Sequence, residues 1–222
     1  QAGDRIVKID EKVYVGDSVT NDGTMSRLKG PKGSVVRLGI KRAGKPKLIG
    51  FSITRGEVPV KTVDAAYMTA PSIGYVRITS FGETTYAEFI AALSKLQTQG
   101  FEKLIIDLRG NPGGYMETAV QLVNEFLPKN ALIVYTQGRK SPRKEYRTDG
   151  RGAYQKIPLV VLVDETSASA SEIFAGAIQD NDRGTIIGRR SFGKGLVQVP
   201  IEFPDGSMLR LTTARYYTPS GR

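Results

Sequence analysis

Apolar and polar residues alternate in two different ways along this chain, and the change comes near residue 60. In residues 1–60 apolar positions recur with the two-residue period of half-buried strands; Val36, Leu38 and Ile40, for example, share one face of such a strand. The predicted elements are strands over 5–9, 34–41 and 48–54, a short helix over 18–29 that stops at Gly30-Pro31, and a linker over 57–60.

From about residue 61, strongly apolar strands alternate with amphipathic helices. The first helix is predicted to open at a capping box, Thr85-x-x-Glu88, and to close at Gly100, and a later helix of small residues begins at Ser169. Strands are predicted over 74–79, 103–108, 132–135, 157–163, 185–188, 196–203 and 208–217, with a turn at 204–206 and an exposed loop over 137–152. This alternation predicts a layered α/β domain over 61–222.

The composition is that of a globular protein with a core of its own: of 222 residues, 40% are apolar and 24% are charged. No apolar run approaches the roughly 18 to 20 residues of a membrane-spanning helix. Lys and Arg exceed Asp and Glu by 32 − 22 = 10, which favours acidic partners. The basic loop 139–144 has no aromatic neighbour except Tyr146, so we expect no nucleic-acid binding. A solvated face or contact with an anionic membrane surface explains the charge.

Two residue types are missing, since the chain contains no His and no Cys. Their absence excludes a Ser-His-Asp triad, a cysteine nucleophile, a disulfide framework and nearly every zinc site. We expect no metal and no cofactor, and Lys, Asp, Glu or Tyr must carry out any proton transfer. The lack of Cys fits an exported protein, and a start at Gln1 without an initiator Met predicts a mature fragment.

A cluster of serines, Ser-Ala-Ser-Ala-Ser-Glu at 167–172, follows the predicted strand 157–163. A Ser at a strand-to-helix turn raises its Oγ at the edge of the sheet, where the first unpaired amides of the helix can stabilise an oxyanion. The plain alternative is a helix N-cap, because Ser is a preferred capping residue. The cluster alone leaves both interpretations open.

Lys194 is the candidate base, in the segment Ser-Phe-Gly-Lys-Gly-Leu at 191–196. A Lys accepts a proton when its pKa falls toward neutrality, which burial among apolar neighbours such as Phe192 and Leu196 would achieve. The alternative is an exposed loop lysine. A P-loop is excluded because Gly195 stands where Ser or Thr would hold Mg²⁺, and the Ser-x-x-Lys motif of penicillin-binding proteins lacks its companion Lys-Thr-Gly.

A glycine-rich loop, Leu-Arg-Gly-Asn-Pro-Gly-Gly at 108–114, ends the predicted strand 103–108. Its glycines expose amides beside the sheet, which suits a second oxyanion donor or a substrate cradle. The same residues are also ordinary turn chemistry. The serine cluster, Lys194 and this loop all lie at the ends of predicted strands, where the sites of α/β proteins gather.

Together these segments resemble the carboxyl-terminal processing proteases, or tail-specific proteases, which are serine peptidases with a Ser-Lys dyad. The similarity lies in Gly-Tyr-Val-Arg-Ile at 74–78, in 104–114, in 164–176 and in Phe-Gly-Lys-Gly-x-Val-Gln at 192–198, in the order of the family. The resemblance covers essentially the whole chain. It implies an α/β fold over 61–222, a layered sheet-and-helix protease core similar to ClpP and the crotonases.

The resemblance also assigns roles to individual residues. It implies that Ser169 is the nucleophile, that Lys194 is the general base and that Gln198 orients the lysine. The separation between nucleophile and base, 194 − 169 = 25, agrees with the usual spacing in the family. Asp180 matches an acidic position that is sometimes assigned to the charge relay.

The amino-terminal part resembles the second half of a PDZ domain, of the form that these proteases carry. The matching segments are 2–6, 28–33 and 35–42. PDZ domains bind a carboxyl-terminal tail by adding it as a strand to the sheet edge. We therefore predict a partial PDZ domain over 1–60, whose first strand and carboxylate-binding loop are expected upstream of Gln1.

The function implied by the resemblance is that of a serine endopeptidase. It would cleave near the carboxyl-terminal tails of unfolded or tagged polypeptides, bound as an added strand, through an acyl-enzyme. Amides of Ala170 and of Gly113 or Gly114 would hold the oxyanion. The resemblance implies a bacterial periplasm or cell-envelope location and leaves the oligomeric state open. The alternative is a catalytically silent PDZ-type peptide-binding scaffold, against which the intact Ser169 and Lys194 argue.

Overall fold

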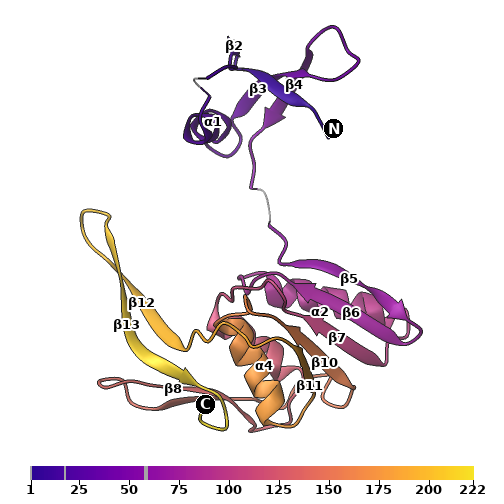
Figure 1. Cartoon of the computed structure of the whole chain (residues 1–222), viewed down its shortest axis with the longest axis vertical. Coiled ribbons are helices and arrows are strands. Elements are labelled where there is room, and N and C mark those ends of the chain that lie inside the picture. Colours follow the sequence, from indigo (N-terminus) through magenta and orange to yellow (C-terminus); the bar gives the residue numbers. More distant parts are fainter. Residues whose placement is uncertain (1, 18, 58–59) are drawn as a thin grey trace. The chain divides into compact units, whose positions relative to one another are not determined.

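The chain folds into two compact units, Gln1–Val60 and Lys61–Arg222, in a computed structural model that describes residues 2–17, 19–57 and 60–222 (Figure 1). Val58 and Pro59 of the predicted linker lie outside the described residues, as does Ser18 at the predicted start of the first helix. Within the described ranges, no helix is long and apolar enough to cross a membrane.

The first unit is a four-stranded antiparallel sheet, in the order β2-β1-β3-β4, with one helix. The alternation predicted for 34–41 is confirmed, because the side chains at 36, 38 and 40 are buried with Ile9 in a small core. The predicted helix begins later than expected because Thr20 caps it, accepting a hydrogen bond from the amide three residues on. The elements are β1 (Arg5–Ile9), β2 (Lys12–Val13), α1 (Asn21–Leu28), β3 (Val35–Lys41) and β4 (Ile49–Thr54).

A five-stranded sheet forms the centre of the second unit, in the order β11-β10-β7-β6-β5. Its strands are β5 (Val63–Ala70), β6 (Ile73–Ile78), β7 (Lys103–Asp107), β10 (Leu159–Val163) and β11 (Thr185–Gly188). All are parallel except β5, which runs antiparallel to β6 at the edge. Because β7 and β10 are parallel neighbours, the loops 108–114 and 164–169 leave the sheet at the same edge.

A second, antiparallel sheet has the order β12-β13-β8-β9. Its strands are β8 (Leu132–Gln137), β9 (Lys144–Arg147), β12 (Leu196–Glu202) and β13 (Met208–Tyr217). Figure 1 shows the hairpin of β12 and β13 extending away from the five-stranded sheet. Strand β9 corrects the prediction that 137–152 is only an exposed loop: Tyr146 packs against the main core and draws this short segment into pairing with β8.

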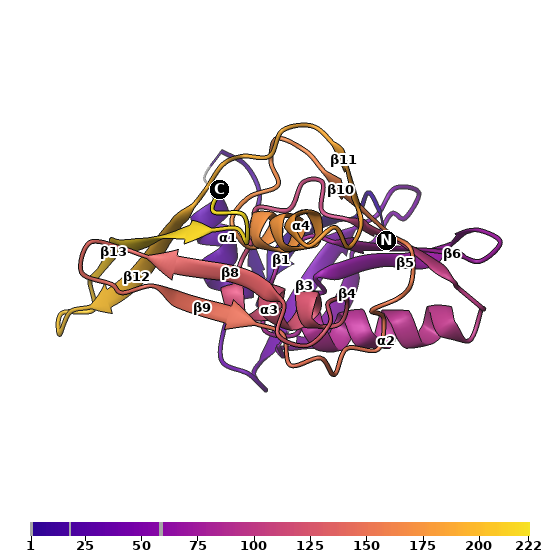
Figure 2. The same cartoon turned by 90° about the horizontal axis from the view of Figure 1, so that it is seen from below.

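Three helices cover the sheets, namely α2 (Thr85–Gln97), α3 (Met116–Asn124) and α4 (Ala170–Asp180). Helix α4 packs against α3 and lies between β11 of the five-stranded sheet and β8 of the antiparallel sheet of this unit (Figure 2). The main core joins fully buried side chains of the central strands and of the helices: Val76, Ile106, Val161, Phe89, Leu122 and Phe174. These findings confirm the predicted mixed α/β arrangement of residues 61–222.

The capping box predicted at Thr85 is wrong. Helix α2 begins at Thr85 itself, after Thr84, whose side chain makes no capping hydrogen bond. Glu88 instead accepts hydrogen bonds from the amides of Thr62 and Val63, which lead into β5. The carboxylate therefore connects this edge strand to the helix. Two backbone amides that would otherwise lack an acceptor bind the Glu88 carboxylate, so it does not cap the helix.

Candidate active site

Ser169 is the N-cap residue of α4, at the end of the loop that leaves β10. Its backbone has φ 55° and ψ −111°, a combination that residues other than glycine rarely adopt. Such a conformation costs about 1–3 kcal/mol and persists only where the surrounding structure enforces it. A half-buried serine, held under strain at a strand-to-helix turn, is the arrangement that presents a nucleophilic hydroxyl.

Asn111 joins the glycine-rich loop to the segment that carries Ser169. The Asn111 side chain is fully buried and donates to Ile78 O at 2.8 Å. Its backbone oxygen accepts hydrogen bonds from the amide of Ala168 and from Ser171 Oγ. Because these partners flank Ser169, the loop 108–114 has a fixed position against the candidate nucleophile.

Asp164 makes a second connection between the same two loops. Its carboxylate accepts hydrogen bonds from the amide of Gly110 and from both the amide and the hydroxyl of Thr166. Burial opposes ionisation of this carboxyl group, but the hydrogen bonds from Thr166, Gly110 and Ser167 outweigh it and hold the pKa of Asp164 at about 2. The carboxylate is therefore charged at neutral pH, which makes these hydrogen bonds strong.

Gly113 and Gly114 occupy positions where a side chain would not fit. A β-carbon on Gly113 would lie 2.5 Å from Ala168 O and 2.9 Å from Ser169 Cβ. One on Gly114 would lie 2.1 Å from Phe81 O. Both residues also have positive φ, 97° and 149°. Gly113 is therefore required for the close approach of this loop to Ser169, and Gly114 for its close approach to Phe81.

The amides beside Ser169 differ in their hydrogen bonding. The Gly113 amide donates to Asn111 Oδ1 at 2.8 Å and is already engaged. The amides of Ala170 and Gly114 have no acceptor among the residues that the structure describes. Of the two glycines considered from the sequence, Gly114 is thus the one whose N–H is available to an oxyanion together with Ala170.

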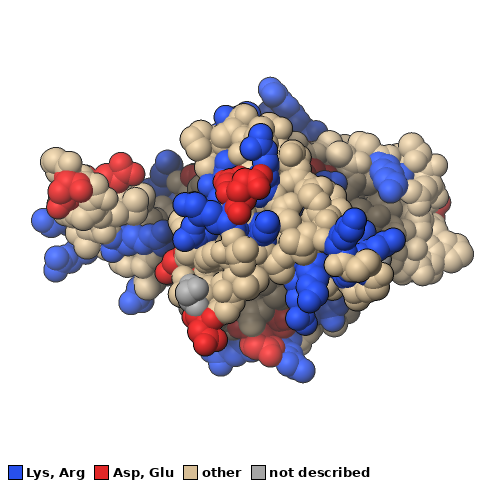
Figure 3. All heavy atoms as spheres, turned by 90° about the horizontal axis from the view of Figure 1, so that it is seen from above, with Lys and Arg blue, Asp and Glu red and all other residues tan. Residues whose placement is uncertain are grey.

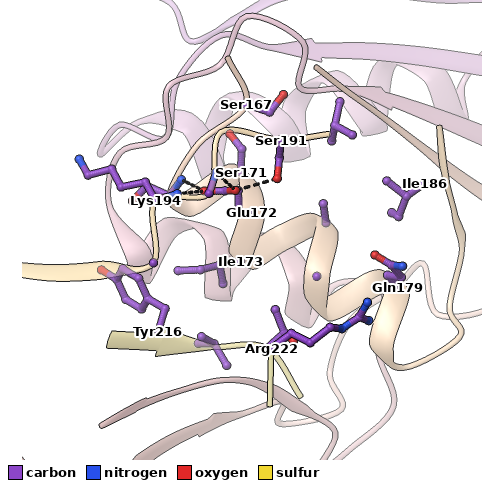
Figure 4. A pocket seen from close by; sticks show the side chains of 18 of the residues that line it. Ser167, Ser171, Glu172, Ile173, Gln179, Ile186, Ser191, Lys194, Tyr216 and Arg222 are labelled. Atoms are coloured by element: carbon purple, nitrogen blue, oxygen red, sulfur yellow. Dashed lines mark hydrogen bonds between the residues drawn. The ribbon is translucent and has the colours of Figure 1, made fainter. Parts of the chain in front are cut away.

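Lys194 lies in the loop between β11 and β12, and its side chain is exposed. The apolar surroundings expected for it are absent, since Phe192 is 67% and Leu196 42% exposed. Figure 4 shows the Lys194 side chain extending away from α4, and none of the hydrogen bonds of the described residues involves its Nζ. Of the two alternatives left by the sequence, the structure shows the exposed loop lysine: backbone contacts hold this loop and leave the Lys194 side chain exposed.

Glu172 makes those backbone contacts, and the sequence interpretation missed this role. Its carboxylate accepts hydrogen bonds from the amides of Ser169, Gly193 and Lys194 and from Ser191 Oγ (Figure 4). The only signal in the sequence was Ser-x-x-Glu at 169–172, which indicates no more than a capped helix.

The structure does not bring Gln198 or Asp180 next to Ser169. Gln198 is exposed in β12, opposite Thr212 and beside a register shift. Asp180 ends α4, 11 residues after Ser169 in the chain, which at about 1.5 Å of rise per residue puts it roughly 16 Å away. The Asp180 side chain is only 1% exposed, and it accepts hydrogen bonds from the amide and the hydroxyl of Ser220.

Asp180 therefore fastens the segment 218–222 to the end of α4. Burial disfavours its charge, but hydrogen bonds from Thr218, Ser220 and Arg222 outweigh burial and hold the pKa of Asp180 below its usual range. An ion pair with Arg222 accompanies these hydrogen bonds. The segment 218–222, held in this way, forms one wall of a cavity beside α4.

A cavity of about 490 Å³ opens between α4, β11 and the segment 216–222. Figure 4 shows Lys194 and Glu172 on one side of it and Arg222 on another. Ser169 and Asp180, at the two ends of α4, also line it. Its walls are mostly apolar and include Val134, Val163, Ile173, Ile186, Tyr216 and Tyr217. A volume of this size holds an apolar side chain next to the candidate nucleophile. Among the described residues, no group of acidic side chains is placed to hold a metal ion.

Two curated relatives and one solved structure that the chain resembles are carboxyl-terminal processing proteases. Over 222 residues the chain is 38% identical to the carboxyl-terminal-processing protease of Synechocystis sp., covering 99% of this chain and 51% of that protein. Over 226 residues it is 42% identical to the carboxy-terminal-processing protease of Bartonella bacilliformis, with coverage of 99% and 51%. The solved photosystem II D1 C-terminal processing protease matches with a TM-score of 0.64 and 33% identity, covering 100% of this chain and 60% of that one.

Residues 72–222 match the family model described as Peptidase family S41. The chain belongs to peptidase family S41, which confirms the resemblance seen in the sequence. It spans about half the length of the curated relatives it matches. The assignment of residues 1–60 to a PDZ domain, the likeness to ClpP and the crotonases, and the roles of individual site residues stay predictions.

Proposed function

We propose that residues 61–222 form the catalytic core of a carboxyl-terminal processing serine endopeptidase, with Ser169 as nucleophile and Lys194 as general base. One observation carries this proposal: the strained Ser169 lies at the mouth of an apolar cavity that Lys194 also lines, beside the available amides of Ala170 and Gly114.

The reaction proceeds in two transfers. The amine of Lys194 takes the proton from Ser169 Oγ, which attacks the peptide carbonyl carbon, while the amides of Ala170 and Gly114 donate hydrogen bonds to the oxyanion. The leaving amine takes the proton from Lys194, and the acyl-enzyme remains. Water then gives a proton to Lys194, attacks the ester carbonyl and releases Ser169 with its proton restored. For the first step the Lys194 side chain turns toward Ser169, on a backbone flanked by glycines.

The substrates are unfolded or tagged polypeptides, cleaved near an apolar carboxyl-terminal tail and bound as an added strand. The apolar walls of the cavity support an apolar residue at the cleaved bond. Strand β12 supports strand addition, since it is an edge strand that begins two residues after Lys194. Gln198, on this strand, is proposed to orient Lys194 once the lysine has turned inward.

We also propose a location in the bacterial periplasm or cell envelope, which the bacterial relatives support. On the face that Figure 3 shows, Lys and Arg form several groups, and acidic side chains are also exposed there. This distribution suits a solvated surface, and contact with an anionic membrane stays a prediction.

The test is the cleavage of an unfolded protein that carries an apolar tail, with wild type compared with Ser169→Ala and Lys194→Ala. Ser94→Ala, on the exposed side of α2, and Lys140→Ala, in the basic loop, are matched controls. We expect both site variants to lose cleavage while they stay folded, and both controls to keep it. Cleavage by Ser169→Ala at the wild-type rate would overturn the proposal, and tail binding without any cleavage would favour the peptide-binding scaffold.

A further inference from the structure

Glu172, in the first turn of α4, uses both of its carboxylate oxygens to connect two separate segments. Oε2 accepts hydrogen bonds from the amides of Ser169 and Lys194, each at 2.8 Å. Oε1 accepts from Ser191 Oγ at 2.7 Å and from the Gly193 amide at 2.6 Å. Figure 4 shows the dashed lines that reach from Glu172 to the loop. A single oxygen atom is thus shared by the amides of the proposed nucleophile and the proposed base.

These contacts exceed what helix capping requires. In a capping box the Glu side chain accepts a hydrogen bond only from the N-cap amide, here that of Ser169. The three other donors belong to the loop 191–194. This loop follows Glu172 in the chain by up to 22 residues and is no part of the helix cap. In this loop the amide of Phe192 is anchored separately, to Ser167 O. Within the described residues, Glu172 therefore supplies the anchors for the amides of Gly193 and Lys194.

We propose that Glu172 is the positioning residue that sets the separation of Ser169 and Lys194. It acts through backbone amides and does not itself touch the substrate. To reach Ser169, the exposed Lys194 side chain then needs rotation only about its own bonds and those of the flanking glycines. The reason is that hydrogen bonds already hold the backbone of Lys194 in position relative to Ser169. The inference rests on the function proposed above.

Glu172→Gln is the informative variant, because it keeps the shape of the side chain. The amide retains one acceptor oxygen, and its NH₂ group is a donor that faces two other donors. Ser191→Ala removes one donor and leaves the three amides in place, so its effect is smaller. Glu165→Gln is the matched control, since Glu165 lies on the loop before Ser169, is exposed and pairs with Arg189.

The first measurement is amide hydrogen exchange by NMR on the full chain. In Glu172→Gln we expect the amides of Gly193 and Lys194 to exchange about tenfold faster or more, as for the loss of a hydrogen bond to a charged group. In Glu165→Gln their rates stay at the wild-type value. Unchanged exchange in Glu172→Gln would overturn the inference.

The second measurement is steady-state cleavage, with active sites counted from the end point of fluorophosphonate labelling, which does not depend on the labelling rate, so that unfolded molecules do not contribute. Misplacement of Lys194 by about 1 Å predicts a loss of kcat on the order of 100-fold, with KM little changed. A role confined to folding would lower the number of active sites and leave kcat per site intact, and that result would overturn the inference. If wild type and Ser169→Ala are equally inactive, the proposed function itself has failed, and the exchange rates alone then show whether Glu172 anchors the loop.

Discussion

Gly113 lies so close to Ser169 that a β-carbon on the glycine would come within 2.9 Å of Ser169 Cβ. The same β-carbon would lie 2.5 Å from Ala168 O and 2.9 Å from the amide nitrogen of Ala170. The glycine-rich loop is therefore in direct contact with the backbone on both sides of the proposed nucleophile. Because Asn111 fixes this loop in turn, the position of Ser169 depends on contacts that are distant in the sequence.

Gly113→Ala is expected to displace Ser169 and to abolish cleavage. A new methyl group would strike backbone atoms, which do not move aside as easily as the end of a flexible side chain. A shift of about 1 Å at a reacting group costs on the order of 100-fold in rate. The measurement is the cleavage rate together with the melting temperature. Gly206→Ala, in the hairpin turn, is the control, since Gly206 also has positive φ, 81°, but a β-carbon added to it would meet no atom within 4 Å. Wild-type cleavage by Gly113→Ala would contradict the contact.

Ile186→Trp is expected to fill the apolar cavity and to change substrate preference. Ile186 lines the cavity, whereas Ile187, its neighbour in β11, is 50% exposed and does not. We expect kcat/KM for a substrate with Leu at the cleaved bond to fall by about tenfold or more relative to one with Ala, because size discrimination in an apolar pocket is of that order. Ile187→Trp serves as the control. Equal losses for both substrates, or the same change in the control, would argue against the cavity as the binding site.

Asp180→Asn is expected to destabilise the fold in a pH-dependent manner. The hydrogen bonds of the carboxylate depress the pKa of Asp180 in the folded state below the ordinary value of 3.8. Its stabilisation is therefore present above that value and is lost as the pH falls through the folded pKa. At pH 7 the free energy of unfolding should fall by about 1–3 kcal/mol, as for the loss of hydrogen bonds to a buried charged group.

Urea unfolding at several pH values between 7 and 2 measures this difference. The gap between wild type and Asp180→Asn should narrow below pH 3.8. The exposed Asp182→Asn should show little difference at any pH. A gap that stays constant down to pH 2 would show that the charge of Asp180 is not what holds the segment 218–222.

Much of the fold follows from the local hydrophobic pattern. The period-two segment at 34–41 and the apolar run at 157–163 became β3 and β10, because their buried faces follow directly from the order of residues. Strand β9 could not be seen in this way, since Lys144–Arg147 is mostly charged and its one contact with the core, through Tyr146, depends on the fold. The role of Glu88 could not be predicted from the local pattern either, because its hydrogen-bond partners, Thr62 and Val63, are 26 and 25 residues away in the chain.

In the site too, features set by neighbouring residues could be predicted, and features set by distant contacts could not. The serine cluster was recognisable as lying at a strand-to-helix turn, but the family resemblance was needed to single out Ser169. The surroundings of Lys194 were not predictable, since its apolar neighbours in sequence, Phe192 and Leu196, face outward in space. Glu172 was visible as a capping residue, but its hydrogen bonds to 191–194 depend on where the chain returns after β11.

Covalent labelling by a fluorophosphonate, followed by mass spectrometry, tests whether Lys194 activates Ser169. The serine oxygen attacks phosphorus and fluoride leaves, so the reaction reports the nucleophile without any requirement for a polypeptide substrate. We predict one adduct on Ser169 in wild type, none in Ser169→Ala, and labelling slower by at least about 100-fold in Lys194→Arg, whose guanidinium stays protonated. Labelling of Ser169 at the same rate in wild type and Lys194→Arg, or an adduct on another residue, would contradict the account.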